Sequence, residues 1–364
     1  MVSAMAEAPE TTLQMESTEN LLEVRNLKMY FPIRHGALGQ VTGYVKAVDD
    51  VSFNIRRGET LGLVGESGCG KSTIGRCIVR AYELTGGQLR YQRADGSVTD
   101  LAMLRNDALR LLRKDVRMIF QDPYASLNPR MTVFDNVSEA LQNAGGMSRE
   151  QMRERVAYLL QRVGLRPEYL SRYPHAFSGG ERQRIGIARA LVTNPRLIVA
   201  DEAVSALDVS IRAQILNLLE ELQEEFHLTY LFISHDLGVI RHICDRVNVM
   251  YVGKLAERAD VGALYRQPKH PYTEALLSSV PISNPRQRGE RAGIQLVGDV
   301  ADPSNPPGGC YFHPRCSYAQ EKCKLEAPPL VEVGAERNGG SGEARVAACH
   351  FADELQLRGV IHDN

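Results

Sequence analysis

The 364-residue sequence has no tryptophan, few aromatic residues and no long apolar run. Aromatic residues make up 6% of the chain. No stretch reaches the roughly 20 apolar residues that a membrane-spanning helix needs. The 43 basic and 44 acidic residues leave a net charge of −1, so the whole chain has no electrostatic attraction to nucleic acid or anionic lipid. These absences predict a cytosolic or peripheral protein that does not bind nucleic acid.

The first 20 residues contain no lysine, no arginine and no apolar run, but they include Glu7, Glu10, Glu16 and Glu19. A secretory signal needs a basic start followed by an apolar core. Residues 1–20 are therefore predicted to form a disordered tail. The rest of the chain is long enough to bury a full core and to hold more than one domain.

Apolar runs alternate with amphipathic stretches from residue 21 to about residue 260, which is typical of an α/β domain. Between about 100 and 190, charges spaced three and four apart predict a helical subdomain. Prolines then accumulate, so a second, irregular unit is predicted over residues 261–364, called the extension below. The predicted strands are 22–27, 45–55, 61–64, 197–200 and 230–233; the predicted helices are 74–79, 149–162, 184–191 and 211–226, and a glycine-containing loop is predicted at 36–43.

The segment Gly65-Glu66-Ser67-Gly68-Cys69-Gly70-Lys71-Ser72-Thr73 matches a P-loop at every fixed position. It lies between a predicted buried strand and a predicted helix, as the motif requires. The glycines let the backbone direct N–H groups at one anion, and the helix N-terminus adds positive partial charge. Lys71 supplies a charge for the β- and γ-phosphates, and Ser72 supplies a hydroxyl for Mg²⁺. The segment predicts binding of a nucleoside triphosphate.

Two carboxylates, Asp201 and Glu202, follow the apolar run 197–200. A buried parallel strand brings such side chains to the sheet edge where ligands bind in open α/β folds. Asp201 is placed to hold Mg²⁺ through water, and Glu202 is placed to polarise the attacking water as a general base. The pair predicts hydrolysis of the bound nucleotide.

A second candidate anion site is Ser178-Gly179-Gly180-Glu181, which precedes the predicted helix 184–191. Serine and glycine at a helix start offer free N–H groups to an anion. One nucleotide does not need two such sites in one domain. The segment is therefore predicted to serve a nucleotide bound by another copy of the fold.

The cysteines are unevenly distributed, and Cys310, Cys316, Cys323 and Cys349 all lie in the predicted extension. Disulfides are rare in cytosolic proteins. The spacing is wider than the Cys-x2–4-Cys pairs of zinc sites, whereas iron–sulfur clusters accept more varied spacing. From the residues alone, a cluster, a zinc ion and unligated thiols all remain open. A bound metal would help a unit with so few apolar residues to keep its shape.

Cys69 is the one cysteine inside the P-loop. A thiol in an anion-binding loop at a helix start is expected to have a depressed pKa. The sequence therefore predicts that an alkylating reagent modifies Cys69 and abolishes hydrolysis, and that MgATP protects it.

Six motifs in order resemble those of the ATPase subunits of ABC transporters. They are the Walker A motif at 65–73, the Q-loop Phe120-Gln121-Asp122-Pro123, the signature at 177–183, the Walker B motif at 197–202, the D-loop Ser205-Ala206-Leu207-Asp208 and the switch histidine in Ile233-Ser234-His235-Asp236. The resemblance implies an α/β fold. A P-loop ATPase core would carry an antiparallel β subdomain, a helical subdomain and a small irregular cysteine-ligated extension.

The resemblance also implies roles for single residues. Gln121 would sense Mg²⁺ and the γ-phosphate, and His235 would steady the attacking water. Asp208 would reach across to a facing subunit. The implied catalytic residues are Lys71, Gln121, Glu202 and His235; the implied Mg²⁺ ligands are Ser72, Gln121 and Asp201; and the residues implied to contact ATP are 65–73, Gln121, Ser178, Gly179, Gly180, Glu181, Asp201, Asp208 and, stacked on adenine, Phe31 with Tyr30 as the alternative.

Three positions depart from the usual pattern of that family. Phe177 and Glu181 replace the usual leucine and glutamine of the signature, and Ala203 follows Glu202 where proline is frequent. None of them removes a group that contacts phosphate, so the site is expected to be competent. Glu181 adds a negative charge near the signature helix.

A narrower resemblance covers almost the whole chain after residue 20. Segments 269–273, 305–316 and 346–350, with the glycine-rich insert 36–43, resemble the second ATPase subunit of dipeptide and oligopeptide importers. In that family the four cysteines ligate a structural [4Fe–4S] cluster. The implied partners are a second ATPase subunit, two permease subunits and an extracytoplasmic solute-binding protein, at the cytoplasmic face of the membrane.

Other functions are compatible with parts of this pattern. A soluble ABC ATPase of translation or DNA repair would usually carry two cassettes or a long coiled-coil insertion, and neither is seen in the sequence. A regulatory module with an inactive site is opposed by Lys71, Glu202 and His235. Relatives of this subtype also carry nickel, antibiotics and other small solutes, so the chain itself does not name its solute.

Overall fold

The computed structural model describes residues 15, 17–36, 39–279, 294, 296, 298–334 and 344–360. Most of the predicted amino-terminal tail, residues 1–14 and 16, lies outside the described residues. Asn20, at the end of that predicted tail, already begins the first strand.

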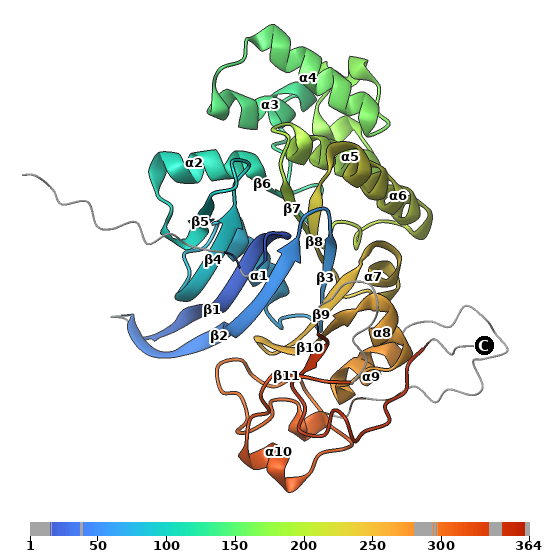
Figure 1. Ribbon diagram of the computed structural model, residues 1–364. Helices are drawn as coiled ribbons and strands as arrows, with labels where there is room; N and C mark the ends of the chain where they lie inside the picture. The colour runs from blue at the N-terminus through green and yellow to red at the C-terminus, as the bar shows by residue number, and fades with distance from the viewer. Residues whose placement is uncertain are drawn as a thin grey trace, which may run out of the picture.

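Within the described residues the strands form two sheets (Figure 1). An antiparallel four-stranded sheet has the order β2-β1-β4-β5, and an eight-stranded mixed sheet has the order β11-β12-β10-β9-β3-β8-β7-β6. The strands are β1 (Asn20–His35), β2 (Gln40–Arg56), β3 (Thr60–Val64), β4 (Gly86–Gln92), β5 (Val98–Asp100), β6 (Val116–Ile119), β7 (Leu197–Asp201), β8 (Thr229–Ile233), β9 (Arg246–Tyr251), β10 (Lys254–Asp260), β11 (Val331–Glu332) and β12 (Val346–Ala347).

The helices cover both faces of the mixed sheet and form a separate group at one end of the molecule, where α3, α4 and α5 lie (Figure 1). They are α1 (Lys71–Ile78), α2 (Asn106–Asp115), α3 (Val133–Ala144), α4 (Arg149–Arg162), α5 (Gly179–Leu191), α6 (Val209–Phe226), α7 (Leu237–Ile243), α8 (Val261–Arg266), α9 (Pro271–Ser278) and α10 (Glu321–Leu325), with short 3-10 turns at Leu101–Met103, Pro167–Ser171, Pro174–Ala176 and His313–Arg315. No helix in the described part of the chain is long and apolar enough to cross a membrane.

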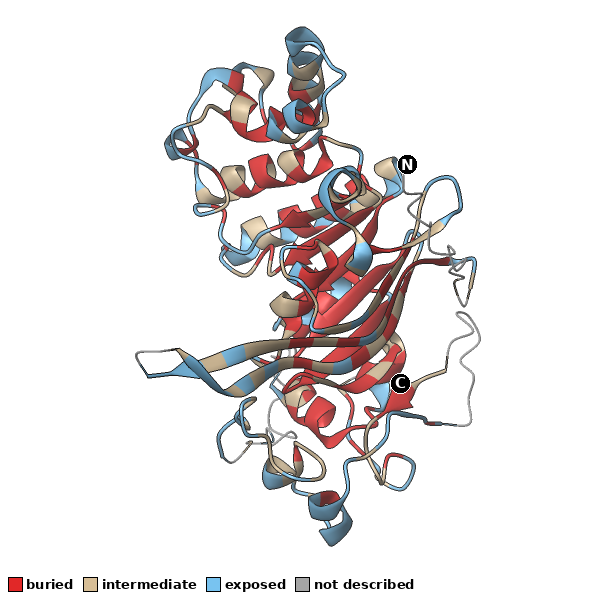
Figure 2. Cartoon of the chain, turned by 90° about the vertical axis from the view of Figure 1, so that its left-hand side faces the viewer, coloured by how far each residue is buried: buried red, intermediate tan, exposed pale blue. Residues whose placement is uncertain are grey.

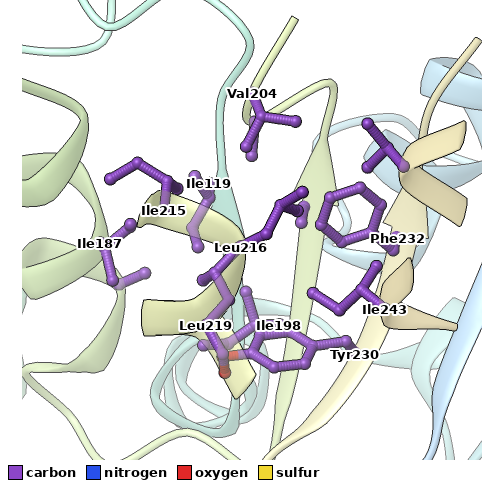
Figure 3. Close-up of a cluster of buried hydrophobic side chains, with 14 of the residues drawn as sticks. Ile119, Ile187, Ile198, Val204, Ile215, Leu216, Leu219, Tyr230, Phe232 and Ile243 are labelled. Carbon is purple, nitrogen blue, oxygen red and sulfur yellow. The ribbon is translucent and has the colours of Figure 1, made fainter. Parts of the chain in front are cut away.

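Strands β7 and β8 are buried on both faces, which explains why they read as continuous apolar runs. Because side chains alternate along a strand, Val199 and Ile233 point to one face and Ile198 and Phe232 to the other. On the first face they pack with α1 and the antiparallel sheet. On the second face they meet Leu216 and other residues of α6 (Figure 3). Both faces of the β7–β8 pair are therefore packed against other parts of the core.

The first hairpin is longer than the sequence predicted. Strands β1 and β2 pair from Asn20↔Arg56 to His35↔Gln40, so much of the predicted loop 36–43 is strand. The reason is that Val41, Thr42 and Val45, which favour strands, continue the alternation across the glycines. The outer half of the hairpin is mostly exposed and projects from the molecule (Figure 2).

The region predicted as a helical subdomain contains a strand of the core. Strand β6 pairs in parallel with β7, from Val116↔Leu197 to Ile119↔Ala200. Its four residues are too short a run to stand out among helical charge spacings. The strand matters for function because its carboxyl end leads directly to Gln121.

The described part of the extension lies at the end of the molecule opposite α3 and α4 (Figures 1 and 2). It continues the mixed sheet, because β12 pairs with β10 and β11 pairs with β12. Next to this pairing, the Arg345 guanidinium donates to Glu257, a fully buried residue of β10, at 2.5 Å. Glu257 also accepts the backbone N–H groups of Lys269 and His270 at 2.9 and 3.0 Å.

Candidate functional site

The glycine loop connects β3 to α1 along a path that only glycine can follow. A Cβ on Gly65 would lie 2.2 Å from the carbonyl oxygen of Met250. At Gly70, where φ is +106°, a Cβ would lie 2.1 Å from the carbonyl oxygen of Ala47. These contacts fix the loop against β2 and β9 and turn its backbone N–H groups inward.

Lys71 begins α1 and is 4% exposed. Its ammonium donates to the carbonyl oxygens of Gly65 and Glu66 at 2.7 and 2.9 Å. The charge is therefore held directly over the loop, where a phosphate would meet it.

Cys69 does not have the reactive character that its place in the loop predicted. Burial raises the pKa of the Cys69 thiol, although Lys71 acts in the opposite direction. The residue is 1% exposed. Desolvation outweighs the nearby charge because the thiol faces the core beneath the loop, where the thiolate is poorly solvated. The predicted depression of the Cys69 pKa is therefore wrong.

One cavity of about 470 Å³ joins the loop to the ends of three parallel strands. Gln121 follows β6, Glu202 follows β7 and His235 follows β8. Because these strands run parallel, their carboxyl ends meet at the same edge of the sheet. The cavity is lined by Ala47, Ser67, Gly68, Gly70, Lys71, Ser72, Thr73, Gln121, Glu202 and His235. Nothing in the sequence singles out Ala47, because it contributes no polar side-chain atom.

The predicted Mg²⁺ ligands Ser72 and Asp201 meet below this cavity. The Ser72 hydroxyl donates to Asp201 Oδ1 at 2.7 Å. Burial raises the pKa of Asp201, and the hydrogen bond from Ser72 counteracts part of that rise. A hydroxyl beside a carboxylate is an oxygen donor set of the kind that Mg²⁺ prefers, so the residues fit the ion.

Glu202 is held between the other two strand-end residues. Gln121 Nε2 donates to Glu202 Oε2 at 2.7 Å, and His235 Nδ1 lies 3.2 Å from Glu202 Oε1. The backbone of Glu202 has φ of +48°, in the left-handed region. Such strain in a residue without glycine's freedom is common at functional sites. The arrangement directs one carboxylate into the cavity with both oxygens engaged.

The residues of the predicted second anion site do not line this cavity. Ser178 caps α5, and its hydroxyl donates to Glu181 Oε2 at 2.8 Å. Glu181 Oε2 also accepts the backbone N–H of Ser178 at 2.9 Å. These hydrogen bonds lower the pKa of Glu181. Asp208, at the start of α6, is exposed and likewise lies outside the cavity.

The two candidates for adenine stacking do not line the cavity either. Phe31 packs edge-on against Tyr82, with ring centroids 5.5 Å apart. The Tyr30 hydroxyl donates to Asp49. Both residues lie in β1, on the antiparallel sheet that faces α1.

The four cysteines of the extension lie around one small cavity. Cys310, Cys316, Cys323 and Cys349 line a single small cavity, and the backbone N–H of Cys310 donates to the Cys323 carbonyl at 2.8 Å. Burial raises the pKa of Cys316 to about 12 and that of Cys349 to about 11. Among the described residues, however, no three His, Cys, Asp or Glu side chains converge closely enough to hold a single metal ion.

Comparison with known proteins identifies the family. Residues 48–205 match the model of the family described as ABC transporter, and residues 256–323 match oligopeptide/dipeptide transporter, C-terminal region. The oligopeptide transport ATP-binding protein AppF of Bacillus subtilis is 52% identical, over 92% of this chain and 98% of AppF. The chain belongs to the ATP-binding subunits of the oligopeptide and dipeptide ABC transporters. The dipeptide transport ATP-binding protein DppF of Escherichia coli is 46% identical, over 90% of this chain and 94% of DppF.

Solved ABC structures have the same fold. The dimeric structure of MJ0796, a bacterial ABC transporter cassette, is 30% identical and covers 66% of this chain and 98% of that one, with a TM-score of 0.57. A second structure of MJ0796, in a post-hydrolysis state with ADP and Pi, matches equally well. The predicted α/β ABC ATPase fold is thereby confirmed. This ABC subunit is an ATPase that uses ATP with Mg²⁺.

Proposed function

We propose that this ATPase drives the import of di- or oligopeptides as one of two ATPase subunits at the cytoplasmic face of a membrane. The observation that carries the proposal is the cavity in which Glu202 is held by Gln121 and His235 beside the P-loop. The names of two similar proteins, AppF and DppF, support the peptide class of solute. Nickel and other small solutes are the alternative cargo.

In the proposed mechanism each residue of the cavity has one task. Lys71 binds the β- and γ-phosphates, and the loop N–H groups complete the cradle. Mg²⁺, held by Ser72, Gln121 and Asp201, would neutralise charge on the phosphates. Glu202 takes the proton of the attacking water, and His235 holds that water in line with the γ-phosphate.

We assign completion of the site to a second ATPase subunit. Ser178 and Gly180 start a helix whose free N–H groups suit an anion, yet they lie outside the chain's own cavity. In a facing pair of subunits these residues would cover the nucleotide of the partner, with Asp208 at the same interface. We expect the pair to consist of two different ATPase chains. The genes for the permease subunits and the binding protein would lie beside the genes for these two chains.

Co-purification and transport measurements test this assignment. A tagged chain expressed with its neighbouring genes should retain two permease subunits and a second ATPase. In proteoliposomes the complex should accumulate labelled di- or oligopeptides, delivered by the binding protein, in an ATP-dependent manner. Accumulation of nickel in place of peptide would reject the peptide cargo, and a chain that retains no membrane subunits would reject the transport function.

Glu181 should weaken the binding of the partner's ATP by the signature segment. Its carboxylate accepts the hydrogen bond of the Ser178 hydroxyl and places negative charge where a phosphate would approach. Glu181→Gln is expected to lower the apparent KM for ATP about threefold, since a neutral acceptor holds the hydroxyl less tightly. The ATP dependence of hydrolysis by the assembled complex measures this effect.

The chain contains a matched control for that substitution. Helix α4 begins with the same capping box, formed by Ser148 and Gln151, so glutamine preserves the geometry. Gln151→Glu should leave the KM unchanged. The depressed pKa of Glu181 adds a pH test. The ionised Glu181 carboxylate contributes to the stability of the capping box above its ordinary pKa of 4.5, and this contribution is lost as the pH falls through the lowered pKa. An unchanged KM in Glu181→Gln would reject the effect.

We propose further that Cys310, Cys316, Cys323 and Cys349 hold a [4Fe–4S] cluster with a structural role. Four thiols around one cavity are a sulfur donor set that suits iron–sulfur clusters and zinc. Ligation would also offset the cost of burying thiolates, which the raised pKa values express.

Anaerobic purification followed by iron, sulfide and zinc analysis tests this site. About four iron and four sulfide per chain are expected, and Cys316→Ser should lower both. A result of one zinc per chain without sulfide would reject the cluster and indicate a zinc site.

A further inference from the structure

An ion pair connects the extension to the P-loop. Arg315, which immediately precedes Cys316, donates to both carboxylate oxygens of Glu66, at 2.6 and 2.9 Å. Glu66 is the second residue of the P-loop. Paired contacts of this kind fix the planes of both groups and are stronger than single hydrogen bonds. The Arg315 side chain is 6% exposed and that of Glu66 is 25% exposed, so the pair is largely shielded from water.

The main chain of Glu66 is a branch point of the loop. Its N–H donates to the Tyr272 hydroxyl at 2.8 Å. Its carbonyl accepts from Lys71 Nζ at 2.9 Å. A change in the position of Glu66 is therefore transmitted to the ammonium group that binds phosphate.

Arg315 is itself rigidly supported. Phe312, three residues earlier, is 3% exposed and packs on Tyr251 and Tyr272, with both ring centroids 5.3 Å away. The Arg315 guanidinium lies 6.0 Å from the centroid of the Tyr251 ring. The cysteine-bearing segment, the end of β9 and helix α9 therefore meet behind the loop. In the sequence, Arg315 lies inside the segment 305–316, and no local pattern gives it a role.

The charge of Glu66 also has a consequence for nucleotide binding. An unpaired carboxylate next to a triphosphate would repel it, and the repulsion is strong where water is partly excluded. Arg315 pairs with that carboxylate outside the cavity, since neither Arg315 nor Glu66 is among the residues that line it.

We propose that Arg315 is a positioning residue of the nucleotide site, which holds and neutralises Glu66 so that the extension contributes directly to ATP affinity. The inference rests on the nucleotide site proposed above. It assigns to the cysteine-bearing segment a role in the ATPase cycle beyond keeping its own shape.

ATP binding by the full-length chain, measured by titration calorimetry, tests the proposal. Arg315→Met should raise the Kd for ATP about tenfold, because Glu66 is left unpaired beside the phosphates. The double variant Arg315→Met with Glu66→Gln should recover most of the affinity, because the repelling charge is gone. Arg315→Lys should lie between the wild type and Arg315→Met. In the assembled complex the change should fall on KM more than on kcat.

A second ion pair between the extension and the core provides the matched control. Arg345 pairs with the buried Glu257 and does not contact the loop. Arg345→Met should loosen the extension without raising the Kd. Equal effects of the two arginine substitutions, or no recovery in the double variant, would overturn the proposal. The site itself is tested separately: if Lys71→Ala binds ATP as the wild type does, the P-loop assignment fails, whatever Arg315 does.

Discussion

ATP hydrolysis is expected to fall by a factor of about 100 or more when Glu202 is replaced by glutamine, since a general base contributes that much or more. Glutamine has the same shape and retains an acceptor for Gln121, whose amide now donates to Glu202 at 2.7 Å. It cannot take the proton of the attacking water. ATP binding should therefore persist, and the blocked, ATP-loaded subunits should accumulate as a pair.

Two measurements check this result. Phosphate release gives the turnover, and sedimentation with ATP gives the state of association. Glu220, which faces His242 at 4.0 Å on the surface, repeats the Glu–His pairing away from the cavity. Glu220→Gln should leave turnover unchanged. Full turnover in Glu202→Gln would remove the general base from the mechanism, and a strictly monomeric ATP-loaded chain would remove the paired site.

The free energy of unfolding is expected to fall by about 3–5 kcal/mol in Arg246→Met, because breaking one side of a buried ion pair leaves the other charge unpaired. Arg246 and Glu59 have side chains 4% and 6% exposed. Arg246 Nη2 donates to Glu59 Oε2 at 2.9 Å and to the Asn54 carbonyl at 3.1 Å. These contacts join β9 and the turn before β3 to β2, so they connect the two sheets.

Urea denaturation of the purified chain measures this loss. The pair formed by Arg162 and Glu225 is the comparison, with side chains 44% and 29% exposed. Arg162→Met should cost much less, because exposed ion pairs contribute little to stability. If the two substitutions cost the same, the Arg246 pair is not the connection between the sheets that its burial indicates.

Much of the nucleotide site could be predicted from sequence because each part ends a strand or begins a helix. Apolar runs marked β3, β7 and β8, and the polar residues that follow them had to meet at one sheet edge. Glu202 and His235 do meet there, and Gln121 joins them from the end of β6, a strand that the sequence did not predict. No single residue shows that these scattered polar side chains form one site. The order of the six motifs along the chain indicates it.

Other features depend on contacts that no local pattern records. The pKa of Cys69 is decided by its burial under the loop, which is a tertiary property. Strand β6 is short and its pairing with β7 depends on the packing of the whole sheet. The contact of Arg315 with Glu66 links residues 249 positions apart. Charge pairs at such separations leave no periodic signal in a sequence.

Strand β12 has a consequence for solubility. Its pairing with β10 covers a row of backbone N–H and C=O groups along the rim of the mixed sheet. The new rim is β11, only two residues long. Short outer strands give an incoming chain little to pair with, whereas a bare β10 of seven residues would invite intermolecular pairing. The extension is therefore expected to reduce pairing between the β10 edges of two molecules.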